Sequence, residues 1–374
     1  MLPATIDIIT QRSHYPRLLS SLQGLSPEEQ KTRLRSLYRT DLYALLRYGL
    51  RRPDVDHQWI FDRCREVQRE FNGVLDLWAR EHYKSTVLTF AGSIFRIIRS
   101  HGEDAPEDRE VTIGIFSHTK PIAKGFLRQI KYELESNEHL QTVFDDIFHA
   151  NPKKDASKWT EDEGITVKRK TNPKEATVEA HGLVDGQPTS KHFLHRQYDD
   201  VVTLESVTSP DMIAKTTSAY EMSDNLGTEG GTFALVGTIY HFADTYRELV
   251  KRKAVKVRTH PCTRDGTENF TPQNCVLMSP ETLKNKRVTQ GAYTFGTQML
   301  LNPKGDNAQA FKSEWIKYTY QQPTGQGMNV YILCDPANEK RRTSDYTTFW
   351  VMGLGPDNNY VALDVIRDRL NLTE

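Results

Sequence analysis

Three adjacent residues, Lys84, Ser85 and Thr86, are of the types that bind the phosphate groups of a nucleotide when they follow a loop in this order. They follow an apolar run, GVLDLWA, and a short polar stretch, and they open a second apolar run, STVLTFAGSIF. This order predicts a strand, a loop and a helix. In such a loop, backbone amides and the helix N-terminus receive phosphate oxygens, the lysine bridges two phosphates, and the next hydroxyl reaches Mg²⁺.

The loop departs from the usual pattern Gly-x-x-x-x-Gly-Lys-Ser/Thr, because Trp78 and Tyr83 stand where the two glycines would be. A side chain at Tyr83 must point away from the phosphates, or the loop must take a different path, since glycine tolerates backbone conformations that other residues avoid. Taken alone, the match is weak. An ordinary strand, loop and helix with an exposed lysine is the simpler explanation.

Two further motifs strengthen the phosphate-binding interpretation. YDDVV places Asp199 and Asp200 beside an apolar stretch, and paired carboxylates hold Mg²⁺ through its water shell and polarise an attacking water. ALVGTIYH ends an expected strand in Gly237 and Thr238, where the Thr238 hydroxyl is placed to sense the terminal phosphate. Without the other motifs, the acidic pair would be read as a solvated strand end.

The segments AREHYKST, YDDVVTLES and GTIYHFADTY resemble, in order and spacing, the motifs of viral large terminases, the ATP-hydrolysing DNA-packaging motors of tailed bacteriophages. The resemblance spans about residues 35–370 in ordered pieces. It implies a P-loop ATPase domain in which Lys84, Ser85 and Thr86 bind ATP and Mg²⁺. It also implies that Arg80, the basic residue near the start of the loop, lies close to the phosphates.

The same resemblance assigns roles to the acidic motif and to one arginine. Asp199 corresponds to the magnesium carboxylate and Asp200 to the catalytic base; Glu205 is the alternative base, because the family often has glutamate in this role. The segment EVTIGIFSHTKPIAKGFLRQIKYELESN is similar to a family region that offers a basic residue to the ATP of a neighbouring subunit. Arg128 is the candidate, although most basic residues on such helices are merely solvated.

The segment NVYILCDPANEKRRTSDYTTFWVMG resembles the opening of the terminase nuclease domain, which has an RNase H-like fold with two metals at its cutting site. The resemblance implies that Asp335 is a ligand of Mg²⁺ or Mn²⁺ and that Asp345 is a nearby participant. Asp364, on the following strand, is a weaker candidate. About 40 residues are too few for such a domain, so we expect the nuclease to be incomplete and the chain not to cut DNA by itself.

The elements that must position these residues form an α/β protein in four segments. We expect an N-terminal helical segment at 1–72, the P-loop ATPase domain at 73–302, a linker rich in Gly and Pro at 303–328, and the start of the nuclease domain at 329–374. Alternating apolar runs and helical stretches predict a mostly parallel sheet in the second segment.

Local signals place several individual elements. SPEEQKTRLRSLYRTDLYALLRYGL has Ser followed three residues later by Glu and then Leu and Tyr at helical spacing, which predicts a capped helix. TVEAHG followed by VDGQPTS predicts a hairpin turn at the Asp-Gly pair. NVYILCDPA begins a new strand, and TTFWVMGLGPDNNYVALDVIRDRL resembles a hairpin with its turn at GPDNN.

Composition limits the classes of function. A chain of 374 residues is long enough for two domains, and 49 basic against 49 acidic residues exclude a protein that coats nucleic acid by bulk charge. No apolar run approaches the roughly 18 residues of a membrane span, and the first residues lack a signal-peptide pattern. His260, Cys262 and Cys275 could meet at a metal, but such scattered residues are usually incidental.

The resemblance predicts a homo-oligomeric ring that drives double-stranded DNA into a procapsid in the host cytoplasm, with portal protein and small terminase subunit as partners. Two other classes stay open. A P-loop helicase or remodelling ATPase would keep the first three motifs but leave Asp335 and Asp345 unexplained. A non-hydrolysing scaffold with a degenerate P-loop would explain Trp78 and Tyr83.

Overall fold

The computed structural model of the chain describes residues 11–303, 317–318, 324–336 and 346–368. The chain divides into two compact units, Met1–Ala308 and Gln309–Glu374. None of the helices in the described parts of the chain is long and apolar enough to cross a bilayer.

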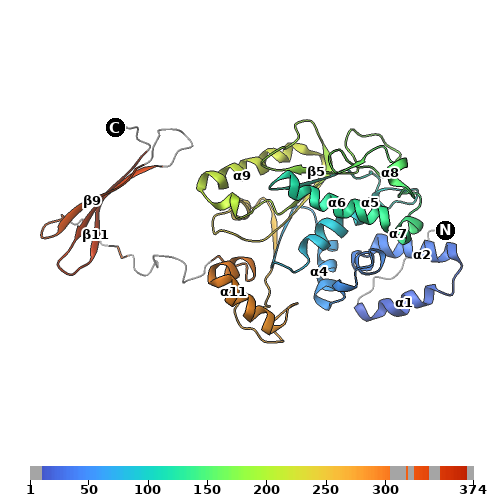
Figure 1. The fold of residues 1–374 in the computed structure, drawn as a ribbon, viewed down its shortest axis with the longest axis horizontal. Coiled ribbons are helices and arrows are strands. Elements are labelled where there is room, and N and C mark those ends of the chain that lie inside the picture. Colours follow the sequence, from blue (N-terminus) through green and yellow to red (C-terminus); the bar gives the residue numbers. More distant parts are fainter. Residues whose placement is uncertain (1–10, 304–316, 319–323, 337–345, 369–374) are drawn as a thin grey trace. The chain divides into compact units, whose positions relative to one another are not determined.

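The first unit is built on an eight-stranded sheet with the order β3-β4-β5-β2-β6-β7-β1-β8 (Figure 1). From β5 to β8 every neighbouring pair is parallel, whereas β3 and β4 add a short antiparallel edge. The strands are β1 (Val74–Trp78), β2 (Ile113–Ser117), β3 (Trp159–Thr160), β4 (Gly164–Ile165), β5 (Val178–Gly182), β6 (Phe193–Asp199), β7 (Gly227–Gly237) and β8 (Lys256–His260). The expected α/β class with a mostly parallel sheet is confirmed.

The central strands are buried on both faces, as parallel strands between two layers are. Successive residues of β2 enter different apolar clusters: Ile113 and Ile115 belong to one, and Phe116 belongs to the other. Helix α6 packs on β2 and β5 (Figure 1). The helices after β1 are η4 (Thr86–Ala91), α5 (Gly92–Ser100), α6 (Lys120–Ser136), α7 (Glu138–Val143), α8 (Pro152–Asp155), η5 (Glu205–Val207), α9 (Pro210–Ser223), η6 (Asp224–Leu226), α10 (Thr245–Lys251) and α11 (Pro280–Gln298).

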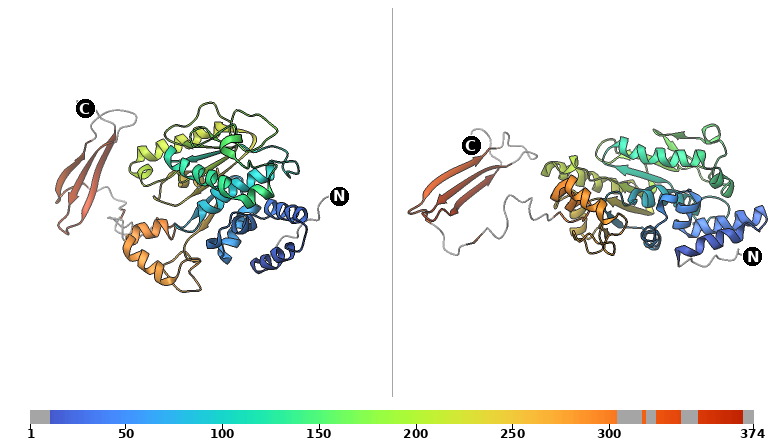
Figure 2. Two further views of the ribbon diagram at one scale, coloured as in Figure 1. Left: turned by 45° about the vertical axis from the view of Figure 1, so that its right-hand side comes forward. Right: turned by 60° about the horizontal axis from the view of Figure 1, so that its bottom comes forward.

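The described residues before β1, from residue 11 onward, are mainly helical, as expected. They form η1 (Arg12–His14), α1 (Tyr15–Leu22), α2 (Pro27–Thr40), α3 (Leu42–Ala44), η2 (Leu45–Gly49), η3 (Pro53–Val55) and α4 (Gln58–Arg69). The expected capping box is present: Ser26 accepts from the Glu29 amide, and the Glu29 side chain accepts from the Ser26 amide. Both views of Figure 2 show α1 and α2 side by side.

These N-terminal helices share one hydrophobic core with the sheet. Tyr15, Tyr43 and Trp59 belong to the same buried cluster as Ile113 and Ile115 of β2. The Trp59 ring meets Trp78, the last residue of β1, edge to face at 5.3 Å between ring centroids. The N-terminal helices therefore pack on the core of the first unit.

The hairpin expected at VDGQPTS is wrong. The turn itself forms, and Gly186 has the positive φ of 77° that such a turn requires. However, β5 and β6 do not pair with each other, because both pair in parallel with β2, which lies between them. A local Asp-Gly signal fixes where the chain turns, but the partner of each strand is decided by burial across the whole sheet.

The second unit contains a three-stranded antiparallel sheet with the order β11-β10-β9. Its strands are β9 (Asn329–Asp335), β10 (Thr347–Leu354) and β11 (Tyr360–Asp368). The expected hairpin at GPDNN is confirmed, because β10 and β11 pair on either side of it and the Gly355 amide donates to the Asn359 carbonyl at 3.0 Å.

Candidate phosphate-binding site

The segment around Lys84 forms the strand, loop and helix that its sequence predicts. Strand β1 ends at Trp78, and η4 begins at Thr86, directly after Lys84 and Ser85. The first helical hydrogen bond runs from the Val87 amide to the Tyr83 carbonyl at 2.9 Å. Lys84 and Ser85 therefore stand where a helix N-terminus points its free amides, which attracts anions.

The loop reaches its shape without glycine. Glu81 and Tyr83 both adopt left-handed backbone conformations, with φ of 62° and 59°. Each such residue stores roughly 1–3 kcal/mol of strain unless its surroundings hold it. Here His82 holds it: the ring is fully buried, and its Nδ1 hydrogen bonds with the Arg80 carbonyl at 2.7 Å.

Trp78 and Tyr83, which occupy the two glycine positions of the usual pattern, lie in different surroundings. Trp78 is not part of the loop, because it is the buried last residue of β1. Tyr83 is in the loop, and its half-buried ring packs against the main hydrophobic core. Burial and the neighbouring Asp54 carboxylate raise the pKa of Tyr83. Tyr83 therefore adopts the backbone conformation that glycine usually has in such a loop, while its side chain packs against the core.

Asp199 connects the loop to the end of another strand. It is the last residue of β6, which lies two places from β1 in the sheet. The Ser85 hydroxyl donates to Asp199 Oδ1 at 3.1 Å, and the Thr89 hydroxyl donates to Oδ2. Burial, followed by the charge of Asp200, raises the pKa of Asp199 to about 7, against the opposing charge of Lys84 and these two hydrogen bonds.

Asp200 lies beside Lys84, with 3.5 Å between Oδ1 and the lysine Nζ. Its backbone is left-handed, with φ of 49°, and both of its backbone groups are bound: the amide donates to Val236 of β7, and the carbonyl accepts from the His118 amide. Asp200 Oδ1 is buried without a hydrogen bond. Asp200 is thus fixed at the carboxyl edge of β2, β6 and β7, and its Oδ1 is an acceptor without a hydrogen bond next to Lys84.

Thr238 and Arg80 also lie around the loop. Thr238 follows β7 and is fully buried, and its hydroxyl donates to the carbonyl of Trp78 at 3.4 Å. The Arg80 guanidinium stacks on the ring of Tyr240 at 5.5 Å. The segment after β7 is therefore in direct contact with the start of the loop.

Glu205 and Arg128 are less tightly placed. The Glu205 side chain is 73% exposed, and its carboxylate lies 3.9 Å from His118 Nε2. Arg128, on α6, is 65% exposed and forms an ion pair with Glu161 at 2.7 Å. The contacts of Arg128 do not include the loop residues, so the structure does not bring it into this site.

The carboxylates of the second unit are not brought together by the described strands. Asp335 is the exposed last residue of β9, rather than the centre of its strand, and pairs with Thr348. Asp364 is exposed and pairs with Val351. Because Thr348 and Val351 are three residues apart on β10, the two carboxylates lie on opposite faces of the sheet. Asp345 lies outside the described residues.

The described part of the chain contains no cluster of three or more His, Cys, Asp or Glu side chains suited to a metal ion. The three soft residues noted in the sequence do not form one either. His260 is bound to Glu66 at 2.8 Å and to Arg63 at 2.7 Å, whereas Cys262 and Cys275 are buried in an apolar cluster.

The donor set at the loop nevertheless fits Mg²⁺ bound together with phosphates. Mg²⁺ keeps several waters and takes few protein ligands, so it needs one hydroxyl and one carboxylate rather than a closed cage. Ser85 and Asp199 are already in contact, Lys84 supplies a positive charge, and Asp200 has a buried acceptor atom without a hydrogen bond. These four residues are therefore of the types that would hold a magnesium-bound polyphosphate.

Sequence reasoning missed two residues around this site, Thr89 and His118, and the cap of α10, Asp244. Thr89 bonds Asp199, and its signal was the four-residue helical spacing from Ser85. His118 follows β2 and reaches Glu205, but only strand order shows that β2 lies beside β6. Asp244 caps α10 and accepts from the Arg247 amide at 3.1 Å, and its position in HFADTYR just before a helix was a usable signal.

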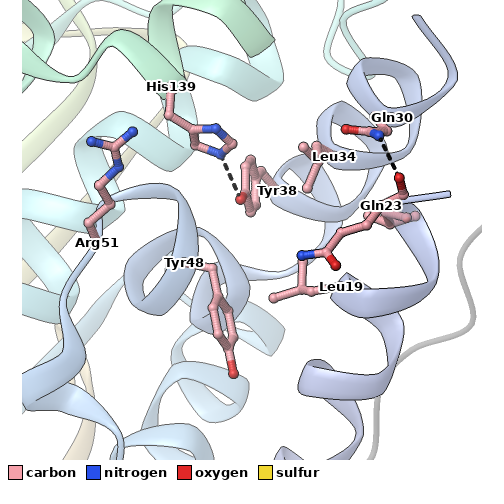
Figure 3. Close-up of a pocket in the computed structure, with 9 residues that line it drawn as sticks. Leu19, Gln23, Gln30, Leu34, Tyr38, Tyr48, Arg51 and His139 are labelled. Atoms are coloured by element: carbon pink, nitrogen blue, oxygen red, sulfur yellow. Dashed lines mark hydrogen bonds between the residues drawn. The ribbon is translucent and has the colours of Figure 1, made fainter. Parts of the chain in front are cut away.

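A second hollow, of about 320 Å³, lies among the N-terminal helices (Figure 3). Tyr38 and His139 both line it and are hydrogen bonded to each other, with 3.0 Å between the hydroxyl and Nε2, and Arg51 adds a cation. Its described lining has no carboxylate and no hydroxyl beside a lysine. This hollow therefore lacks the combination of lysine, hydroxyl and carboxylate that the loop between β1 and η4 and the end of β6 bring together.

No family model matches the chain, and no curated protein matches it either. Among solved structures, the chain is similar to the large terminase of bacteriophage HK97, with 13% sequence identity and a TM-score of 0.43. The similarity covers 79% of this chain and 59% of the terminase chain. The chain thus spans less than two thirds of that protein.

Proposed function

We propose that the chain is the ATPase subunit of a viral DNA-packaging motor, a large terminase. The observation that carries the proposal is the contact of Ser85 and Lys84, from the loop after β1, with Asp199 and Asp200, from the end of β6. This arrangement brings a lysine, a hydroxyl and two carboxylates together, which is the set of groups that a site for magnesium-bound ATP requires. The order and spacing of AREHYKST, YDDVVTLES and GTIYHFADTY add the terminase assignment.

The geometry supports a division of roles in ATP hydrolysis. Bound Mg²⁺ neutralises charge on the phosphate oxygens. Ser85 and Asp199 would hold it, and Thr86 opens the helix whose free amides would receive phosphate oxygens. Lys84 turns from Asp200 to the phosphates, which frees the Asp200 carboxylate to accept the proton of the attacking water.

Asp200 is a better candidate for the base than Glu205. Its carboxylate is held near Lys84 and is only 23% exposed, whereas that of Glu205 is 73% exposed. A base must sit within hydrogen-bonding reach of the water that attacks, so a fixed and shielded carboxylate is favoured. Thr238, bound to the end of β1, reports phosphate release to the segment that contains Tyr240, on which Arg80 stacks.

The remaining parts of the proposal rest on the motif resemblance. They are translocation of double-stranded DNA into a procapsid, a ring of identical subunits in the host cytoplasm, partnership with portal protein and small terminase subunit, and DNA cleavage with Mg²⁺ or Mn²⁺ through a nuclease domain that begins with Asp335 and Asp345. In such a ring a neighbour supplies a basic residue to the ATP, and exposed Arg128 keeps that candidacy, since its partner Glu161 is a surface residue.

The test is ATP hydrolysis by the purified chain over a wide range of protein concentrations, compared with Lys84→Ala. We expect activity that rises more steeply than concentration, because subunits complete one another's sites, and that disappears in the variant. Retained ATP turnover in Lys84→Ala would show that the loop after β1 does not bind the hydrolysed ATP.

A non-hydrolysing scaffold is the second candidate, and the left-handed Glu81 and Tyr83 favour it, because they make the loop less adaptable than a glycine loop. The two functions differ in a simple measurement. A scaffold with a closed loop shows no rise in melting temperature with Mg²⁺ and ATP, whereas the motor does.

A further inference from the structure

The hollow among the N-terminal helices, of about 320 Å³, is lined by one face of each of two neighbouring helices (Figure 3). On each helix the lining residues are three or four positions apart, which places them on the same side. They are Leu19, Leu22 and Gln23 at the end of α1, and Gln30, Leu34 and Tyr38 on α2. Binding pockets measure about 300–1,000 Å³, so this hollow accommodates a few side chains rather than a whole helix.

Part of the lining is apolar and incompletely covered. Leu19, Leu34 and Tyr48 are half-buried, and they pack on the main hydrophobic core of the first unit. An apolar group placed among them would remove more of their surface from water, which is the main favourable term in most protein association. The hollow therefore suits an aliphatic side chain.

The polar part of the lining contains a single full charge. Tyr38 and His139 satisfy each other through their hydrogen bond of 3.0 Å. Burial raises the pKa of Tyr38, and burial followed by the charge of Arg51 lowers the pKa of His139. Both side chains are therefore neutral near pH 7, and Arg51 is the one charged residue of the described lining.

The Arg51 guanidinium forms no ion pair with a carboxylate of the described residues. Burial raises the pKa of Glu133, against a hydrogen bond from Asn137 and the charges of Arg52 and Arg51. Glu133 does not line the hollow, however, and its carboxylate accepts from Asn137 Nδ2 at 2.6 Å. A cation beside an apolar hollow, without an acid of its own, is complementary to a carboxylate on an incoming molecule.

The backbone fixes Arg51 near His139. Arg51 has a left-handed conformation with φ of 53°, two residues after the end of the π-turn η2. Asn137 Nδ2 donates to the carbonyl of Gly49, the last residue of η2, at 2.8 Å, and Asn137 also caps α7, which contains His139. Strained residues and π-turns are frequent at functional sites.

We propose that this hollow docks an extended acidic segment of a partner protein, which inserts an aliphatic side chain between Leu19, Leu34 and Tyr48 and places a carboxylate on Arg51. Side chains two residues apart lie on the same side of an extended chain, so one segment supplies both groups. Gln23, exposed at the rim, offers an amide group to the peptide backbone. None of the lining residues belongs to the loop after β1 or to the end of β6, so the proposal does not depend on ATP binding.

The test is an NMR titration of the full chain with ¹³C-labelled leucine methyl groups. The probe is a capped peptide of alanines with one leucine and, two residues later, one glutamate, and its twin has glutamine in place of glutamate. We expect the acidic peptide to shift the methyl signals of Leu19, Leu22 and Leu34 and to bind about three- to tenfold more tightly than its twin. This preference should disappear in Arg51→Gln and persist in Arg33→Gln, a matched change of an exposed arginine on α2.

Equal affinity of the wild type for the two peptides, or an undiminished preference in Arg51→Gln, would overturn the pairing of the carboxylate with Arg51. Shifts confined to other leucines, or no shifts, would overturn the hollow as a docking site. Equally tight binding of isocaproate, an aliphatic acid without a peptide backbone, would assign the hollow to a small molecule. Changes in the same signals on raising the protein concentration alone would assign it to a second copy of the chain. Either of these last two results would overturn the partner segment.

Discussion

Asp199 of the first unit is buried and accepts hydrogen bonds from Ser85 and Thr89, whereas Asp335 and Asp364 of the second unit are exposed on opposite faces of their sheet. The topologies explain the difference. Parallel neighbours all end at the same edge, so residues after β1, β2, β6 and β7 converge there. In the second unit β9 and β11 flank β10 and end at the same edge, but Asp335 and Asp364 project from opposite faces, so these strands do not gather their carboxylates.

The neighbours of an acidic residue, rather than its place in a motif, therefore decide its charge state and its hydrogen bonds. Asp200 sits beside Lys84 because β6 and β1 belong to one sheet, although 116 positions separate the two residues in the numbering (200 − 84). The strands that carry Asp335 and Asp364 supply no comparable lysine or hydroxyl contact among the described residues.

The largest expected effect concerns the base. Asp200→Asn should lower the turnover of ATP by roughly 10²- to 10⁴-fold, the range of general-base contributions. Glu205→Gln should change it by less than about threefold, because that side chain is exposed and outside the loop contacts. Single-turnover hydrolysis measures both. The reverse ranking would make Glu205 the base and would contradict the assignment of that role to Asp200.

A smaller effect concerns the pH dependence of stability. Burial raises the pKa of Asp244 from 3.8 to about 6, so the folded state binds a proton that the unfolded state has released between those two pH values. The stabilising contribution is therefore present below about pH 4 and is lost as pH rises through about 6. Asp244→Asn keeps the helix cap but does not titrate.

The free energy of unfolding of Asp244→Asn, taken relative to that of the wild type, should increase from pH 4.5 to pH 7.5 by on the order of 1–3 kcal/mol. Urea unfolding at both pH values measures the difference, with Asp211→Asn, an exposed residue in the first turn of α9, as the control. A gain that does not vary with pH would show that the buried carboxyl does not titrate in this range.

A still smaller effect is expected at Thr238. Thr238→Val removes the hydroxyl that donates to the Trp78 carbonyl, which should lower the free energy of unfolding by about 0.5–1.5 kcal/mol. If Thr238 only supports the fold, ATP turnover at 25 °C should stay unchanged once the folded fraction is accounted for. A separate fall in turnover, with unchanged ATP affinity, would assign it the sensing role.

The smallest effect is expected in the second unit. Asp335→Asn and Asp364→Asn should leave ATP hydrolysis unchanged and alter stability by less than about 0.5 kcal/mol, because both side chains are exposed. Cleavage of plasmid DNA with Mg²⁺ or Mn²⁺ gives the complementary readout, and we expect none from this chain. DNA cleavage by the wild type that Asp335→Asn abolishes would contradict this contrast, because the second unit would then contain an active site.

The sequence by itself determined the local elements and part of the site. Ser26 and Glu29 fixed a helix start, GPDNN fixed the β10–β11 hairpin, and the residue types in AREHYKST and YDDVV identified the loop and the acidic pair. These features depend on neighbours within a few positions, where hydrogen bonding and backbone preference act directly. A short stretch of sequence therefore contains all the information they require.

Only the tertiary structure decided which of these parts meet. It inserted β2 between β5 and β6, turned Tyr83 into the core, joined Thr89 to Asp199, left Arg128 at the surface with Glu161, and put Leu277 and Met278 beside the loop. The physical reason is that strand partners and buried contacts are set by the burial of both faces of the whole sheet, a property that no local pattern contains.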